Sequence, residues 1–168
     1  TDNTKWYLQS LRYQYDSLGF SNNFKFVWHD QPMGYAGATN AGLEHSTADL
    51  VVLLNNDVIL LEQPKNKWLE MLAAEFKVEP RCGISCLIKD FSEPANSEFA
   101  IGFCVMVSRA VFNTIGFINT EYKQGFGEDI DFSIQTLRAG FEICQVGQKT
   151  MNTGDTFWTG PVPIYHVG

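Results

Sequence analysis

The sequence predicts an α/β fold, and three of its features support this class. Segments with helical and with strand-like hydrophobic patterns alternate along the chain. The run Leu50–Leu54 contains only leucine and valine, as buried strands of parallel sheets do, and leads directly into Asn55-Asn56-Asp57. The chain has 168 residues, 45% of them hydrophobic, which suffices for one core. We therefore expect a single α/β domain over residues 1–168.

The first half of the chain is expected to hold three helices and two strands. In the first helix, which we expect the region 1–4 to cap, apolar residues recur every three or four positions: Tyr7, Leu11, Tyr15 and Leu18. A strand is predicted at 24–28, followed by an alanine-rich helix from about Ala36. After the strand Leu50–Leu54, the third helix ends before Pro80 and carries the apolar stripe Trp68, Leu69, Leu72 and Phe76.

The second half is expected to hold three strands and two helices. The strands are predicted at 84–88, 100–107 and 141–146, and the helices at 110–115 and 129–139. Residues 90–99 and 147–163 are polar or rich in Gly, Thr and Pro, and we expect them to form loops. Long loops in compact domains tend to be functional, so we expect these two to border the binding site.

Charge and composition exclude several classes of protein. The net charge of −7 argues against a nucleic-acid partner, whose phosphates require a positive surface. No apolar stretch approaches the roughly 20 residues needed to span a bilayer. Cys82 and Cys86 have a spacing found in zinc sites, but no second pair follows at a suitable distance. We interpret the four cysteines as reduced core thiols of a cytoplasmic protein.

The polar residues after the central strand form the first candidate site. Asn55, Asn56 and Asp57 would lie at the carboxyl end of the strand, where open α/β sheets bind ligands. Their oxygen atoms suit Mg²⁺ or Mn²⁺ carrying a phosphorylated substrate. The alternative is an ordinary turn, since Asn and Asp are common turn residues.

Two further motifs lie on either side of this strand in the sequence. Upstream, residues 32–43 form a loop that passes into a helix of small residues, where a helix N-terminus could hold a phosphate. The same small residues could instead allow tight packing of the helix on the sheet. Downstream, Gly125 and Gly127 precede the acidic residues that open the helix at 129–139.

The order of these motifs resembles that of the family 2 glycosyltransferases, which have the nucleotide-sugar-binding GT-A fold. The matching residues are Gly34, Gly37, Asn40, Asn55, Asn56, Asp57, Glu128, Asp129 and His166. Residues 100–109 and 115–119 also resemble the acceptor-side strand and the turn that follows it. The resemblance implies a Rossmann-like, mixed but largely parallel sheet flanked by helices. It also implies that the chain lacks the first βαβ unit, a unit of roughly 30 residues.

The resemblance assigns a role to each matching residue. Asp57 and His166 would hold the Mn²⁺ or Mg²⁺ ion. Asp129 would be the catalytic base, and Glu128 would orient the acceptor hydroxyl. The donor, a nucleotide-diphosphate sugar, would contact Gly34, Gly37, Asn40, Asn55 and Asn56.

Each of these roles has a plain structural alternative. His166 could be an ordinary surface or core histidine, an interpretation that His29 and His45 keep. Asp129 could simply cap its helix, although Asp131 fits the capping role better. We expect the helix dipole and the free N–H groups of the first turn to keep Asp129 ionised.

Two residues depart from the family pattern. Asn55 stands where the family usually has the first aspartate of an Asp-x-Asp pair, which removes a charge from the metal site. Gln135 stands where relatives commonly carry arginine, which could alter the choice of donor.

With one carboxylate base and no nucleophile in evidence, we expect direct displacement with inversion, through an oxocarbenium-like transition state. The "QxxRW" motif of processive synthases is absent, so we expect a non-processive enzyme that glycosylates a saccharide or a lipid-linked saccharide. Two alternatives remain open: a sugar-phosphate nucleotidyltransferase, and a non-catalytic module that binds nucleotide sugars.

Overall fold

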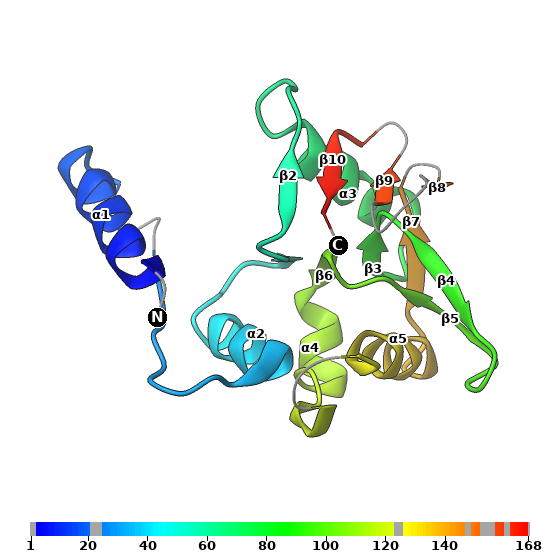
Figure 1. Cartoon of the computed structure of the whole chain (residues 1–168). Helices are drawn as coiled ribbons and strands as arrows, with labels where there is room; N and C mark the ends of the chain where they lie inside the picture. The colour runs from blue at the N-terminus through cyan, green and yellow to red at the C-terminus, as the bar shows by residue number, and fades with distance from the viewer. Residues whose placement is uncertain are drawn as a thin grey trace. The chain divides into compact units, whose positions relative to one another are not determined.

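The computed structural model describes residues 3–20, 25–122, 126–146, 149–151, 157–159 and 162–167 (Figure 1). Contacts divide the chain into two compact units, Thr1–Met33 and Gly34–Gly168, which we describe separately. The single domain expected from the sequence stays a prediction.

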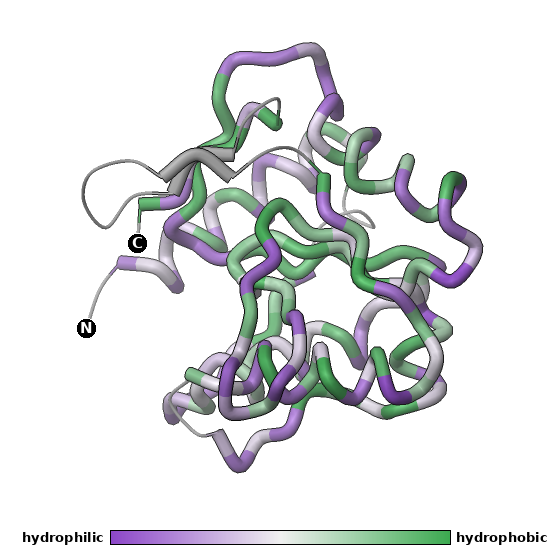
Figure 2. The backbone as a smooth tube through the Cα atoms, turned by 90° about the vertical axis from the view of Figure 1, so that its right-hand side faces the viewer, coloured by the Kyte–Doolittle hydropathy of each residue, from purple (hydrophilic) through white to green (hydrophobic). Residues whose placement is uncertain are grey.

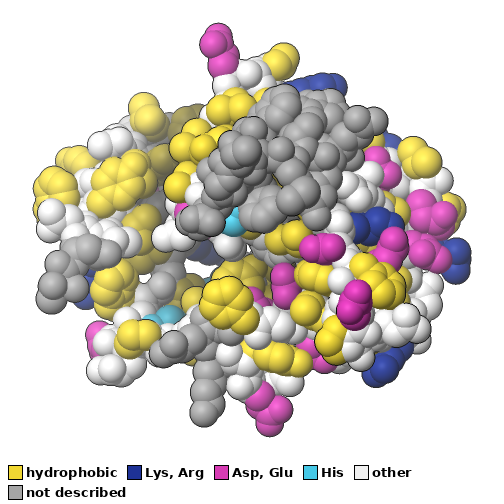
Figure 3. All heavy atoms as spheres, turned by 45° about the vertical axis from the view of Figure 1, so that its right-hand side comes forward, with side chains coloured by type: hydrophobic (Ala, Val, Ile, Leu, Met, Phe, Trp, Pro, Cys, Tyr) yellow, Lys and Arg dark blue, Asp and Glu magenta, His cyan; other side chains and the backbone are white. Residues whose placement is uncertain are grey.

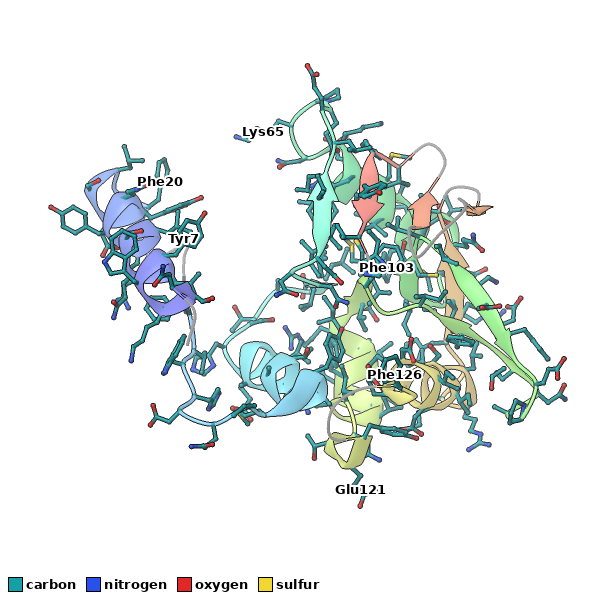
Figure 4. The ribbon with its side chains drawn as sticks, in the orientation of Figure 1. Tyr7, Phe20, Lys65, Phe103, Glu121 and Phe126 are labelled. Carbon is teal, nitrogen blue, oxygen red and sulfur yellow. The ribbon has the colours of Figure 1, made fainter. Side chains whose placement is uncertain are left out.

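The first unit contains the helix α1 (Thr4–Ser17), which confirms the expected first helix. None of its side chains is buried, and Tyr7 and the nearby Phe20 project from it in Figure 4. Asn3 occupies the N-cap position without a side-chain hydrogen bond, and the other candidates for the cap, residues 1–2, lie outside the described residues.

The strand predicted at 24–28 is wrong for residues 25–28, which form no strand, while Phe24 lies outside the described residues. The physical reason is the lack of a hydrogen-bonding neighbour, because the described part of this unit contains no strand. Ring contacts with α1 take its place: Lys5 Nζ lies 5.0 Å from the centre of a Trp28 ring, and Arg12 lies 5.7 Å from that of Phe26.

A four-stranded sheet forms the centre of the second unit. Its strands are β1 (Leu50–Leu54), β3 (Cys82–Cys86), β6 (Cys104–Ser108) and β7 (Glu142–Gln145), in the order β1-β6-β3-β7. Strands β1, β3 and β7 run in one direction and β6 runs against them, because β6 pairs antiparallel with both β1 and β3 while β3 and β7 are parallel. The sheet is therefore mixed, as expected, but two of its three strand pairs are antiparallel and only β3 and β7 pair in parallel.

Helices cover both faces of this sheet (Figure 1). The chain forms α2 (Gly34–Glu44), α3 (Lys67–Val78), α4 (Arg109–Ile115) and α5 (Glu128–Arg138). Alternation along β6 separates two hydrophobic clusters: Val105 and Val107 pack with residues of α2, α4 and α5, whereas Cys104 and Met106 pack with Leu72 of α3. Figure 2 shows hydrophobic segments gathered around the central strands.

The two predicted loops contain strands, so both predictions are corrected in part. Within 90–99, the chain forms a hairpin of β4 (Lys89–Ser92) and β5 (Ser97–Ala100), which also shows that the strand predicted at 100–107 begins only at Cys104. Within 147–163, the described residues form β8 (Lys149–Met151) and β9 (Phe157–Thr159). These join β10 (Ile164–His166) and β2 (Val58–Leu60) in an antiparallel sheet of order β2-β10-β9-β8.

All four cysteines are free thiols, and three of them are buried. Burial raises the pKa of Cys86 and of Cys104 to about 12, so these thiols stay protonated at neutral pH. Among the described helices, none is both long and apolar enough to cross a membrane.

Strand β3 packs so closely that one of its residues has no room for a side chain. A Cβ on Gly83 would lie 2.7 Å from Phe141 Cβ and 2.8 Å from Val111 Cγ2. We expect Gly83→Ala to lower the free energy of unfolding by about 1–3 kcal/mol, the usual cost of overpacking a core. Gly42→Ala is the matched control, because a Cβ there meets nothing within 4 Å, and in helix α2 it should raise stability by about 0.5–1 kcal/mol. Denaturant unfolding measures both, and equal effects would contradict the packing argument.

Candidate active site

The residues after β1 meet the C-terminal strand. Strand β10 pairs with β2 so that His166 lies opposite Val58, the residue that follows Asp57. His166 Nε2 consequently lies 3.3 Å from Asp57 Oδ1, and the Val167 N–H donates to the Asp57 carbonyl at 3.0 Å. The structure thus brings Asp57 and His166 together, from opposite ends of the second unit's sequence.

An aromatic ring holds the His166 imidazole in place. The rings of Phe103 and His166 stack with centroids 4.3 Å apart and planes 9° from parallel. The His166 side chain is only 13% exposed and lines the cleft described below. Stacking of this kind fixes the plane in which the ring nitrogens can bind a ligand.

The turn 101–103 (Ile101, Gly102, Phe103) links the two halves of the site. It joins β5 to β6, and its Phe103 carbonyl accepts a hydrogen bond from the Asn55 N–H at 2.9 Å. On its other side, the Gly102 N–H donates to the Asp129 carboxylate. The backbone of one short turn therefore contacts both the end of β1 and the start of α5.

Asp129 lies in the first turn of α5 but is not its N-cap. The N-cap is Gly127, with a φ of 103°, and the helix begins at Glu128. Asp129 Oδ1 accepts a hydrogen bond from the Ile130 N–H at 2.8 Å, while the Gly102 N–H reaches the same carboxylate from outside the helix. Its carboxylate is thus held from two elements, which a capping role alone does not require.

The pKa of Asp129 is raised, opposite to the direction expected from the helix N-terminus. Burial is the largest cause, since it disfavours the charged form; the hydrogen bonds from backbone N–H groups oppose it and lower the pKa. The capping role predicted for Asp131 is also corrected, because its Oδ2 accepts a hydrogen bond from Gln135 Nε2 at 2.7 Å, one turn along the helix.

A cleft of about 460 Å³ lies between these groups. Figure 4 labels Phe103 near β6 and Phe126 near the start of α5, the two sides between which the cleft opens. Its polar lining residues are Tyr35, Asn55, Glu128, Asp129 and His166. Phe126 lines the rim with 97% of its surface exposed and with a φ of 73°, which is uncommon for any residue except glycine.

The cleft has an acidic character and two unsatisfied acceptors. Of the described residues that line it, none is Lys or Arg. Figure 3 shows acidic and hydrophobic side chains next to each other on this side of the molecule. Asn55 Oδ1 and Glu128 Oε2 are buried atoms that accept no hydrogen bond from the described residues. Buried acceptors of this kind usually bind a ligand, an ion or water.

The remaining predicted donor residues lie outside the lining of the cleft. Asn56 is exposed in the turn after β1, Gly34 begins α2 with a φ of 68°, and Gly37 is buried within α2. Asn40 holds another segment of the chain, since its Nδ2 donates to the Ile118 carbonyl at 2.7 Å and its Oδ1 accepts from the Ile118 N–H at 3.1 Å. Both ends of this amide are thus engaged with Ile118, and the donor-binding role of Asn40 stays a prediction.

Sequence reasoning missed Tyr35 and Phe103, which lie at the centre of the site. Tyr35 follows Gly34 in the loop that the sequence singled out, and Phe103 follows Gly102 inside an apolar run. The available signal was Gly102, because a glycine within a strand-like segment often marks a close approach of the backbone.

The family model for glycosyl transferase family 2 matches residues 1–101, which is more than half of the chain. The chain belongs to this family. A comparison with curated protein sequences gives no match.

Two solved glycosyltransferase structures are similar to the chain in fold. One is the mannosyltransferase PcManGT from Pyrobaculum calidifontis in complex with GDP-Man and Mn²⁺, with a TM-score of 0.62 and 17% identity over 86% of this chain and 42% of that one. The other is the catalytic domain of Drosophila β1,4-galactosyltransferase 7 in complex with xylobiose, with a TM-score of 0.51 and 16% identity over 79% and 50%. The chain spans half of their length or less, and the likeness confirms the GT-A fold expected from the sequence.

The contacts of Asn40 predict a structural role for this residue. Asn40→Ala removes both hydrogen bonds to Ile118, whose backbone is then left unpaired in a buried place. We expect the free energy of unfolding to fall by about 1–3 kcal/mol. Asn113→Ala, an exposed asparagine in α4, is the control and should change stability by less than about 0.5 kcal/mol. An Asn40→Ala protein with unchanged stability but weaker nucleotide binding would support the donor role instead.

Proposed function

We propose that this chain serves in the transfer of a sugar from a nucleotide-diphosphate sugar to a hydroxyl acceptor, with inversion at the anomeric carbon. The observation that carries the proposal is the placement of His166, paired with Asp57, and of the Glu128-Asp129 carboxylates on the walls of one cleft. One fold neighbour is a mannosyltransferase in complex with GDP-Man and Mn²⁺, and the other is a galactosyltransferase in complex with xylobiose, which supports a nucleotide-sugar donor and a saccharide acceptor.

The charge of the cleft supports a divalent ion. A departing diphosphate carries negative charge, and the described lining residues include carboxylates but no Lys or Arg to neutralise it. Among the described residues no three His, Cys, Asp or Glu side chains gather as a complete metal site. Asp57 and His166 supply two ligands, which suits Mg²⁺ or Mn²⁺ when waters and the substrate's phosphates complete the coordination. When bound, the ion would stabilise the charge that develops on the leaving oxygen.

Asn55 fits a supporting role at this site. Its Oδ1 is buried, lines the cleft and accepts no hydrogen bond from the described residues. A ribose hydroxyl or a water bound to the ion could donate to it. Its amide carries no charge, so the ion depends mainly on Asp57 for electrostatic attraction.

Asp129 is the group placed to accept the acceptor's proton. In the proposed step, the acceptor oxygen forms a bond to the anomeric carbon as its proton passes to Asp129. The bond from that carbon to the diphosphate oxygen breaks, and its electron pair leaves with the diphosphate. A raised pKa makes Asp129 a stronger base than an ordinary aspartate. Glu128 Oε2 accepts no hydrogen bond from the described residues. It can accept one from a second hydroxyl group of the acceptor substrate and so orient that substrate.

The finer parts of the proposal concern the acceptor and the course of the reaction. We propose a non-processive transfer to a saccharide or lipid-linked saccharide in polysaccharide or glycoconjugate synthesis. Assays with UDP-, GDP- and dTDP-sugars test the proposed donor class, and parallel assays with a sugar 1-phosphate plus a nucleoside triphosphate test for a nucleotidyltransferase. The anomeric configuration of the product, read by NMR, tests inversion.

The metal assignment predicts a graded loss of Mn²⁺ affinity. Asp57→Ala and His166→Ala should each weaken Mn²⁺ binding by at least about tenfold, and the aspartate variant more, because Asp57 carries the charge. His45→Ala is the control, since the exposed His45 follows α2 and its ring contacts the Ala41 carbonyl of that helix. Calorimetry with Mn²⁺ alone measures the affinities. Mn²⁺ affinity equal to that of the wild-type protein in both variants, or turnover that is insensitive to EDTA, would contradict the assignment.

The base assignment predicts a loss of turnover without a matching loss of stability. Asp129→Asn should lower kcat by about 10²–10⁴-fold, the usual contribution of a general base, and Glu128→Gln should cost less. Stability should change little, because the variant loses one accepted hydrogen bond but also loses a buried charge. The raised pKa means that the folded state prefers protonated Asp129, so ionisation of Asp129 costs stability as pH rises through this pKa.

The pH profile provides a second test of the base. Since only ionised Asp129 accepts a proton, kcat should fall as pH drops through its pKa, at a higher pH than the ordinary value of about 3.9 would give. Near-normal turnover in Asp129→Asn, or parallel losses of turnover and melting temperature, would show that the residue only supports the helix.

A further inference from the structure

Gly102 lies in a tightly enclosed position beside the proposed base. A Cβ on this residue would lie 3.3 Å from Asp129 Cβ, and 3.9 Å from both Asp129 Oδ2 and the Tyr35 hydroxyl oxygen. The absence of a side chain is what allows the backbone of turn 101–103 to approach the carboxylate. Small movements of Gly102 therefore change its hydrogen bond to Asp129 directly.

Two anchors hold α5 against this part of the chain. The Gly102 N–H binds Asp129, and one helical turn later the buried Ser133 Oγ accepts a hydrogen bond from the Ala100 N–H at 3.0 Å. Asp129 and Ser133 are four residues apart and therefore share one face of α5. The second anchor fixes the helix, whereas only the first acts on the carboxylate itself.

Tyr35 contacts the carbonyl group of Gly102. Its hydroxyl donates to the Gly102 carbonyl at 3.3 Å and accepts a hydrogen bond from Thr39, which lies one turn along α2. Burial raises the pKa of Tyr35, and the nearby Glu128 and Asp129 raise it further, so the hydroxyl keeps its proton and acts as a donor. Tyr35 also lines the cleft.

We propose that Tyr35 is a positioning residue of the catalytic base, which it orients through Gly102. With the carbonyl of Gly102 held by Tyr35 on α2 and its N–H bound to Asp129 on α5, both backbone dihedrals of this glycine are restrained. The N–H then stays directed at the carboxylate, where it favours the ionised, proton-accepting form. This inference rests on the proposed function of Asp129 and adds a role for a residue on a different element.

The titratable groups around Asp129 limit what else could cause a change in its titration. Glu128 lies beside it on α5, Tyr35 faces it from α2, and His166 lines the same cleft from β10. Turn 101–103 contributes no titratable side chain. Removing only the Tyr35 hydroxyl leaves Glu128 and His166 unchanged.

The test is Tyr35→Phe, which keeps the ring and removes the hydroxyl. We expect kcat to fall about tenfold, the rate equivalent of one hydrogen bond, with less than a twofold change in the donor KM. The acid limb of the kcat profile should move upward by about half a pH unit or more, because a weakened Gly102 bond raises the pKa of Asp129. Tyr13→Phe is the control, since Tyr13 is an exposed residue of α1 that does not line the cleft, and it should leave the profile in place.

A spectroscopic measurement separates this inference from the proposed function. In the wild-type protein, the chemical shift of the Gly102 amide in ¹H–¹⁵N NMR spectra should change with pH together with the ionisation of the Asp129 carboxylate. In Tyr35→Phe, this change in chemical shift should be smaller and its midpoint should lie at a higher pH. Unchanged titration in Tyr35→Phe would overturn the positioning role even if transfer is observed. A wild-type protein that titrates as expected but transfers no sugar would instead overturn the proposed function. Melting temperatures confirm that both variants are folded.

Discussion

The site depends on the backbone of turn 101–103. Its Phe103 carbonyl binds the Asn55 amide at the end of β1, its Gly102 N–H binds the Asp129 carboxylate at the start of α5, and the Phe103 ring stacks on His166. These contacts connect segments that lie far apart in the sequence. Three consecutive residues therefore set the distance between Asp129, which would accept a proton, and the Asn55 and His166 side of the site, which would face a leaving diphosphate. Any change in the turn would alter both halves of the site together.

Electrostatics explains why the cleft has this composition. The chain is acidic overall, and the described lining of the cleft adds Glu128 and Asp129 without Lys or Arg. Such a cleft repels a bare diphosphate. A divalent ion at Asp57 and His166 would reverse the local sign on one wall while the opposite wall stays negative. A metal-bound donor and a proton acceptor can then occupy the same small volume, with burial keeping Asp129 a better base than a solvated carboxylate.

The sequence predicted those elements whose residues interact with near neighbours. The strand Leu50–Leu54 is an uninterrupted apolar run, and helices such as α3 carry a hydrophobic period, so their positions follow from local pattern. Residues 25–28 were also predicted as strand from their local pattern but form no strand. A strand needs a hydrogen-bonding partner, and the local pattern does not show whether one is present. The pairing of Asp57 with His166 came from the family resemblance. The contact between Tyr35 and Gly102 was not predicted. It joins residues 67 positions apart in the sequence, and its acceptor is a backbone carbonyl, which no choice of side chain marks in the sequence.

The direction of β6 has a consequence for how such a site can diversify. Because β6 runs against β1 and β3, it begins at the edge where those two strands end, and the turn that enters it binds the neighbouring segments through its main-chain amides and carbonyls. Main-chain amides and carbonyls are the same in every amino acid except proline, which lacks the N–H. Ile101 contributes its side chain to the cleft wall, while its N–H binds the Ile88 carbonyl. Substitutions at this position can therefore reshape the space available to an acceptor while the scaffold around the proton acceptor keeps its geometry. In this fold, selectivity and chemical competence can thus evolve separately.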